Sequence, residues 1–211
     1  MNSCITCKEA IEHCMSTHTF AFAHLYGDEK IMDMHIHNCC EVYYSISGGK
    51  QFLIDHCLYD IRPGDLFLIN QFESHHLTQI DQQTHERIIL SIDPEYLSKL
   101  STGVTNLSHC FSFRDTRMPH QIHLSPKEQN RFMYFIHELH DDGGMGEDLL
   151  DQAIFLELMV FLNRAFAAQT PHPLPRLHLP ITTPRWTPFY PTSTPISASR
   201  WRSPVCPRIF L

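Results

Sequence analysis

Three histidines and one glutamate in the N-terminal half of the chain have the types and spacing of a metal-ligand set. His35, His37 and Glu41 form the pattern H-x-H-x3-E, and six further residues lead to Gly48. In a strand, residues two positions apart lie on the same face, so these three side chains would project together. Two imidazoles and a carboxylate suit zinc, nickel, iron or manganese. His75, arriving from another strand, would complete a four-ligand set.

A second interpretation needs no metal, because the same polar side chains could line a pocket for a polar small molecule. Aromatic side chains nearby would add stacking surface to the hydrogen-bonding groups. The sequence leaves both interpretations open, and a sugar, an aromatic acid and a bare metal ion all fit. The candidate effector-binding residues are His35, His37, Glu41, Tyr44 and His75.

These side chains must be positioned by strands. Alternating patterns predict strands at residues 17–26, 41–47, 51–54, 57–61, 66–69 and 86–92. Gly48, helped by Ser47 and Gly49, is predicted to form a hairpin turn. Short strands with short connections predict an antiparallel barrel or sandwich. Alternate residues would line its interior, and Tyr44, Phe52, Ile54 and Phe67 are candidates for that lining.

The two polar segments resemble the motifs of the cupin fold, which supply three histidines and one glutamate as metal ligands. The first motif matches at His35, His37, Glu41 and Gly48. The second motif normally has a proline and a glycine where this chain has Asn70 and Phe72, while its histidine matches His75. The resemblance implies a mainly β protein with some helix, built on a jelly-roll barrel over residues 17–124.

From residue 125 the pattern becomes helical. Ser125, Pro126 and Glu128 have the positions of a helix cap, first-turn proline and capping-box glutamate. A second helix, predicted over 147–168, is apolar around more than one face, so two helices form a hairpin over 125–168. That hairpin is either buried within one chain or used as a homodimer interface, and we expect the interface. The candidate dimerisation residues are Phe132, Phe135, Ile136, Leu139, Leu150, Ile154, Leu158 and Phe161.

Residues 15–168 as a whole resemble the N-terminal half of AraC-type transcription regulators. The resemblance rests on H-x-H, on Glu-Val-Tyr-Tyr at 41–44, on Arg-Pro-Gly-Asp-Leu-Phe-Leu-Ile-Asn at 62–70, and on 86–97. In that family this half senses a small-molecule effector and dimerises, and the other half binds DNA through two helix-turn-helix motifs. The resemblance therefore implies a non-enzymatic sensor. The competing function is a metal-dependent cupin enzyme, of the dioxygenase or sugar isomerase type, with the same four ligands.

The last part of the chain has a different composition. Residues 169–211 contain ten of the 14 prolines, five arginines and no acidic residue, whereas residues 1–168 hold all 23 acidic residues. We expect this tail to be disordered. The helix-turn-helix half expected after residue 170 is missing, which a frameshift or truncation would explain; a genuine proline-rich tail is the alternative. DNA would then be a partner only through the missing half.

Two further expectations concern the N-terminus and the location of the protein. Residues 1–16 are predicted to be flexible. No apolar run approaches the roughly 20 residues that span a bilayer, and the eight cysteines do not form the framework of a small secreted domain. We therefore expect a cytoplasmic protein without a membrane partner.

Overall fold

The computed structural model describes residues 6–27, 33–49, 51–79, 85–112, 119–139 and 144–169. The chain divides into two units, Met1–Leu177 and His178–Leu211, and all described residues belong to the first unit. The predicted disorder of the proline-rich tail therefore lies outside the described residues, apart from Gln169 at its start.

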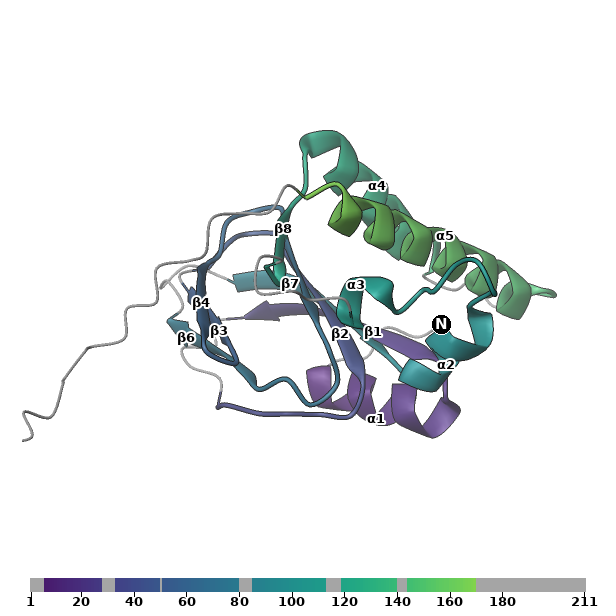
Figure 1. The fold of residues 1–211 in the computed structure, drawn as a ribbon, viewed down its shortest axis with the longest axis horizontal. Helices are drawn as coiled ribbons and strands as arrows, with labels where there is room; N and C mark the ends of the chain where they lie inside the picture. Colours follow the sequence, from purple (N-terminus) through teal and green to yellow (C-terminus); the bar gives the residue numbers. More distant parts are fainter. Residues whose placement is uncertain are drawn as a thin grey trace, which may run out of the picture. The chain divides into compact units, whose positions relative to one another are not determined.

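Within the described residues, eight strands form two antiparallel sheets, in agreement with the predicted antiparallel barrel or sandwich, although only six strand segments were predicted. The larger sheet has the order β1-β7-β2-β5-β8, and the smaller has the order β4-β3-β6. The larger contains β1 (Phe20–Gly27), β2 (Cys40–Ser45), β5 (Asp65–Ile69), β7 (His85–Ile92) and β8 (Gln121–His123). The smaller contains β3 (Gln51–Ile54), β4 (Cys57–Asp60) and β6 (His75–Gln79). Figure 1 shows the small sheet on one side of the large sheet and helices α4 and α5 on the other.

Alternation along β2 divides the large sheet into two faces. Val42 and Tyr44 belong to the cluster that packs under the helices, whereas Tyr43 belongs to the cluster between the two sheets. That interior cluster also holds Phe52 and Ile54 from the small sheet. Because apolar residues from both sheets meet there, the interior is a packed core that fixes the position of any polar group beside it.

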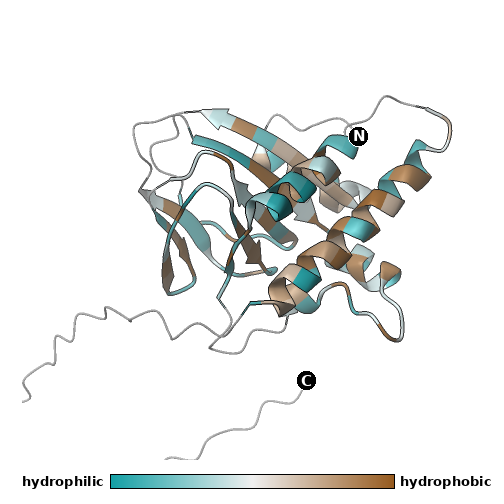
Figure 2. Cartoon of the chain, turned by 90° about the horizontal axis from the view of Figure 1, so that it is seen from above, coloured by the Kyte–Doolittle hydropathy of each residue, from teal (hydrophilic) through white to brown (hydrophobic). Residues whose placement is uncertain are grey.

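Among the described residues, four helices follow on the outer face of the large sheet: α2 (Pro94–Leu100), α3 (His109–Ser112), α4 (Pro126–Glu138) and α5 (Glu147–Ala167). The Phe155 ring of α5 stacks on Phe20 with 4.3 Å between centroids, and Phe132 of α4 lies 4.6 Å from Tyr44. Figure 2 shows hydrophobic residues along most of α5. Among the described residues, none of the helices combines the length and the hydrophobicity of a membrane span.

The predicted dimerisation surface is mostly core of the single chain. Six of the eight candidates are buried within it, which corrects the prediction: Phe132, Phe135, Ile136, Leu139, Leu158 and Phe161. Ile154 is partly buried, and Leu150 remains 61% exposed. The helical periodicity identified an apolar surface correctly, but that surface packs within the chain, against the large sheet at Phe132 and between the two helices at Phe135 and Phe161.

The prediction of a flexible N-terminus is wrong for Cys7–Thr17, which forms helix α1. Thr6 and Glu9 make a capping box: the Glu9 amide donates to Thr6 Oγ1, and the Thr6 amide donates to Glu9 Oε2. Ala10 and Cys14 are buried against small residues of β1 and against Cys39. Small side chains on both surfaces let this helix pack closely on the barrel.

Gly48 forms a turn, but not the predicted hairpin. Its φ is +84°, a conformation that favours glycine. The flanking strands β2 and β3 lie in different sheets and do not pair. A Cβ at Gly48 would lie 3.0 Å from the Pro63 Cδ, so the residue is a tight corner between the sheets.

Candidate functional site

Two strand ends and an irregular segment position the four predicted ligands. Glu41 is the second residue of β2, and His75 is the first residue of β6. His35 pairs with His75 in an isolated bridge, in which each backbone amide donates to the other's carbonyl at 3.1–3.2 Å. The Phe72 amide donates to the His37 carbonyl at 2.8 Å. The segment 35–39 is thus not the regular strand that the H-x-H spacing predicts, and backbone contacts to residues 72–75 hold its histidines in place.

The structure brings all four side chains together. One ligand atom from each of His35, His37, Glu41 and His75 lies within 4.8 Å of the others. His37 Nε2 is 3.0 Å from Glu41 Oε2, and His75 Nε2 is 3.7 Å from the same oxygen. Glu41 is 2% exposed, His75 is fully buried and the His37 side chain is 6% exposed, whereas His35 is partly exposed. The cluster therefore lies nearest to solvent at His35.

Each histidine uses its Nδ1 atom for a backbone contact. His35 Nδ1 lies 3.1 Å from the Asp33 carbonyl oxygen, His37 Nδ1 lies 3.0 Å from that of Cys39, and His75 Nδ1 lies 2.9 Å from that of Glu73. A carbonyl only accepts, so each Nδ1 carries the proton and donates it. The second nitrogen of each ring, Nε2, is then left for the cluster. This arrangement is typical of histidines that ligate metals.

The His37–Glu41 pair is charged in the absence of a metal. Burial opposes protonation of His37, but its contacts with Cys39 and Glu41 outweigh that effect and raise its pKa to about 10. Burial likewise opposes ionisation of Glu41, yet His37 and His75 hold the pKa of this carboxyl well below its ordinary value. A buried carboxylate is therefore present to bind a cation.

The pKa values of the other two histidines, His35 and His75, are shifted in opposite directions. Burial lowers the pKa of His35, and the neighbouring His75 adds to this effect. Burial also disfavours charged His75, but the Glu41 carboxylate outweighs it and raises the His75 pKa. The cluster thus contains one carboxylate and three crowded imidazoles, so most of its potential metal-ligand atoms are nitrogens.

These residues fit a divalent metal. His75 Nε2 is buried and makes no hydrogen bond within the described part of the chain, although it points at Glu41. An unsatisfied buried nitrogen costs free energy unless a ligand or water contacts it. Three imidazole nitrogens and one carboxylate form a donor set used for zinc, iron, nickel and manganese. A metal bound by all four residues would satisfy that nitrogen.

Cys39 is a neighbour of this cluster whose role the sequence did not reveal. Its Sγ lies 3.3 Å from His37 Nδ1. A hydrogen bond with Cys14 of α1 lowers the Cys39 pKa most; burial opposes that effect, His37 adds to it, and the pKa falls to about 6. From the sequence, a cysteine here reads as a small apolar filler. The structure instead places a polarised sulfur beside a predicted ligand.

Ser91 is a second neighbour that sequence reasoning missed. The β2–β7 register puts Ser91 directly opposite Glu41. Its hydroxyl is buried and makes no hydrogen bond within the described residues. The H-x-H motif contains no signal for this residue, because only the pairing of distant strands places it beside Glu41.

Tyr44 does not join the site, which corrects that prediction. Its ring packs against Phe132 on the helix-covered face of the sheet. Adjacent residues of a strand point to opposite faces, so Tyr43 faces the interior instead. The Tyr43 hydroxyl is bonded to His85 Nε2. Phe52, Ile54 and Phe67 do face the interior, as predicted.

Comparison with solved structures returns matches over a limited region. A mutant of oxalate decarboxylase from Bacillus subtilis is 21% identical, with a TM-score of 0.33, over 36% of this chain and 21% of that one. A protein from Ralstonia eutropha JMP134, described as a mannose-6-phosphate isomerase, is 13% identical, with a TM-score of 0.34, over 36% of this chain and 76% of that one. The aligned region thus spans only about a fifth of the oxalate decarboxylase chain.

Comparison with curated proteins returned no match. The profile of the AraC-like ligand binding domain matches residues 19–159. That span includes every strand of the described residues, helices α2 to α4 and most of α5, together with all four residues of the histidine and glutamate cluster. This chain therefore belongs to the AraC-like ligand binding domain family.

Proposed function

We propose that this chain is the effector-sensing domain of an AraC-type transcription regulator, and that His35, His37, Glu41 and His75 form its effector site around a divalent metal. The observation that carries the proposal is the shared use of Nδ1. All three histidines donate Nδ1–H to backbone carbonyls, so three Nε2 atoms converge beside one carboxylate. A site that binds only a polar organic molecule would not require all three histidines to use Nδ1 for a backbone hydrogen bond and to turn Nε2 toward the cluster.

The site suits a small polar effector. When bound, a divalent metal supplies positive charge and open coordination positions for a hydroxyl or carboxylate group. The chain's own residues add specificity: Glu41 accepts hydrogen bonds, and the Ser91 hydroxyl lies opposite it across the sheet. Phe52 lies 6.1 Å from His75 and closes the inner side with an apolar ring. A sugar-like or carboxylate-bearing metabolite, entering past His35, matches these features.

The proposal also includes a homodimer, but with a smaller contact surface than the sequence indicated. Leu149 and Leu150, in the first turn of α5, are large apolar residues that the chain leaves exposed. We assign them to a homodimer contact, because the remaining candidates on α4 and α5 are mostly buried. DNA binding would depend on helix-turn-helix motifs of the intact regulator.

Metal content tests the site. The full chain should be purified without an affinity tag and analysed for metals beside His37→Ala. The matched control is His24→Ala, since His24 pairs with Glu86 away from the cluster. We expect one metal per chain at this site in wild type and control, and its loss in His37→Ala. An unchanged metal content in His37→Ala would contradict the proposal.

A second measurement separates sensing from catalysis, because a metal-dependent cupin enzyme would use the same four residues. The metal-loaded chain should be heated with a panel of sugars and small carboxylic acids. A rise in melting temperature without consumption of the compound supports a sensor. Turnover of a compound that depends on His37 would support the enzyme instead.

A further inference from the structure

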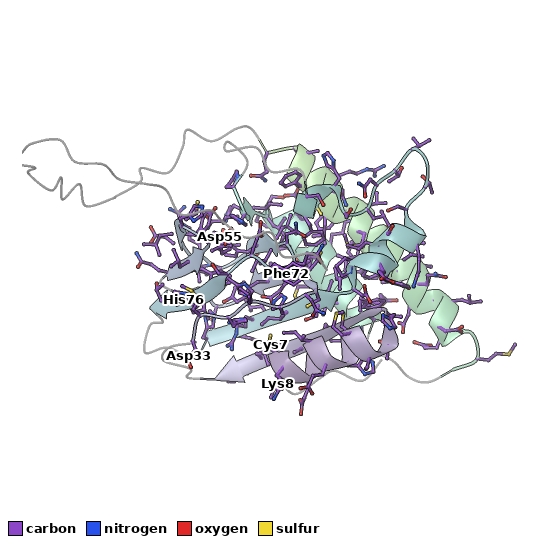
Figure 3. The ribbon with its side chains drawn as sticks, turned by 60° about the horizontal axis from the view of Figure 1, so that its bottom comes forward. Cys7, Lys8, Asp33, Asp55, Phe72 and His76 are labelled. Carbon is purple, nitrogen blue, oxygen red and sulfur yellow. The ribbon has the colours of Figure 1, made fainter. Side chains whose placement is uncertain are left out.

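A second group of possible ligands lies apart from the first cluster. It consists of Asp55, Glu73 and His120, whose ligand atoms lie within 4.8 Å of one another. Asp55 is in the turn between β3 and β4, Glu73 is in the loop between β5 and β6, and His120 directly precedes β8. Figure 3 shows Asp55 on the side of the small sheet, away from Cys7 and Lys8 of α1. Three distant segments therefore meet at one point.

His120 is oriented as a ligand would be. The residue is 9% exposed, and its Nδ1 lies 2.8 Å from the Tyr59 hydroxyl. Its Nε2 is buried and makes no hydrogen bond within the described residues, although it lies 3.4 Å from Glu73 Oε2. Tyr59 thus holds the ring at Nδ1. The other nitrogen, Nε2, points toward the Glu73 carboxylate, but the geometry between them does not form a hydrogen bond.

The two carboxylates are held in place by the backbone. Asp55 Oδ1 accepts from the Ser74 amide at 3.0 Å and from the Ser74 hydroxyl at 3.2 Å. Glu73 Oε2 accepts from the Asn70 amide at 2.7 Å. Asp55 has a φ of +51°, in the left-handed region that aspartate and asparagine enter more readily than most residues with a Cβ. The loops thus hold two negative charges beside one buried imidazole.

We propose that Asp55, Glu73 and His120 bind a second divalent cation. Two carboxylates and one imidazole suit a cation such as Mn²⁺, which favours oxygen ligands and accepts nitrogen. The cation would contact the unsatisfied His120 Nε2 and neutralise the two carboxylates. Tyr59 would hold the ring from behind, as outer partners of metal ligands do.

The second site is linked to the first through a three-residue segment. Glu73 offers its carboxylate to the second site, while its carbonyl accepts from His75 Nδ1 of the first site. Ser74, between them, bonds to Asp55 through its amide, hydroxyl and carbonyl groups. A cation at the second site would therefore steady the backbone that orients His75. The proposal itself does not depend on the function of the first site.

Counting bound Mn²⁺ tests this proposal on the full chain. Metal-free protein should be dialysed against Mn²⁺ and the bound ion counted in wild type, His37→Ala, Asp55→Asn and the double variant. Asparagine tolerates positive φ and keeps an oxygen that can accept from Ser74, so Asp55→Asn should fold. Asp60→Asn is the control, because Asp60 is an exposed carboxylate on the neighbouring strand β4.

We expect two ions in wild type and in Asp60→Asn, one in each single variant, and none in the double variant. Asp55→Asn should weaken the affinity for the second ion by at least about tenfold, a rough figure for a disturbed metal site. His120→Gln is a second variant that should also lose this ion. An ion count in Asp55→Asn equal to that of wild type would overturn the proposal. A single ion in wild type that vanishes in His37→Ala would overturn it too, while leaving the first site intact.

Discussion

At the scale of single residues, the candidate site is defined by which ring nitrogen each histidine uses. Residue type and spacing identify His35, His37 and Glu41, but three carbonyl oxygens decide that Nε2 faces the cluster. Those carbonyls belong to Asp33, Cys39 and Glu73. The backbone path around the ligands therefore matters as much as the ligands themselves.

The raised pKa of His37 predicts that metal binding at the first site releases protons. His37 is protonated below a pKa of about 10 in the metal-free chain, and it must lose the Nε2 proton to ligate. The apparent affinity should therefore rise between pH 7 and 9, by about tenfold per pH unit from His37 alone. Calorimetry in two buffers of different ionisation enthalpy measures the released protons. An affinity independent of pH would contradict this assignment.

Phe72 predicts a stabilising substitution. This residue has a φ of +63° and is 65% exposed, at a position where the cupin motif has glycine. Left-handed backbone costs about 1–2 kcal/mol for a residue with a Cβ, and glycine costs about 0.5–1 kcal/mol in lost chain entropy. Phe72→Gly should thus raise the free energy of unfolding slightly, by about 0.5–1 kcal/mol, as measured by urea titration.

Phe72→Ala is the control for this prediction. Alanine keeps the strained backbone while removing the ring, so it should not stabilise the chain. If Phe72→Gly lowers the free energy of unfolding, the exposed ring contributes a contact that outweighs the backbone strain.

At the scale of elements, amphipathic patterns predicted most strands and both long helices. The strand predicted at 51–54 coincides with β3, and the helices predicted from 125 and 147 are α4 and α5. The short elements α3 and β8 were missed, because three or four residues show no measurable periodicity, and no strand was predicted over the range of β6. Helix α2 was also missed, although Asp93 caps it and Pro94 begins it.

Two substitutions distinguish the role of the buried residues of the helical layer from that of its exposed end. Phe135 is buried in the chain, so Phe135→Ala should lower the free energy of unfolding by about 3–5 kcal/mol. Leu150 is exposed, so Leu150→Arg should leave the stability of a monomer nearly unchanged but weaken a homodimer. Sedimentation equilibrium and urea unfolding measure the two effects independently.

Val104→Arg is the matched control, because Val104 is an almost fully exposed apolar residue between α2 and α3. It should change neither stability nor association. Equal association of wild type and Leu150→Arg would exclude this end of α5 from a dimer contact.

At the scale of the whole molecule, the described chain is a ligand-binding domain with an acidic composition. The full sequence has a net charge of −7, and the acidic residues all precede residue 169. The family profile ends at residue 159, within α5. A net negative charge repels nucleic-acid phosphate. The proposed regulator would therefore bind DNA through a part other than this domain.

The sequence by itself identified the candidate histidine and glutamate cluster, most of the strands, the two long helices and the family. Each depends on residue types at short spacings along the chain, such as His35, His37 and Glu41. Only the tertiary structure decided which surfaces meet. Periodicity shows that α4 and α5 have apolar faces, but not that Phe132 packs on Tyr44 and so removes both from the proposed interface and pocket. The meeting of Asp55, Glu73 and His120 likewise depends on loop paths between distant strands, which no local pattern records.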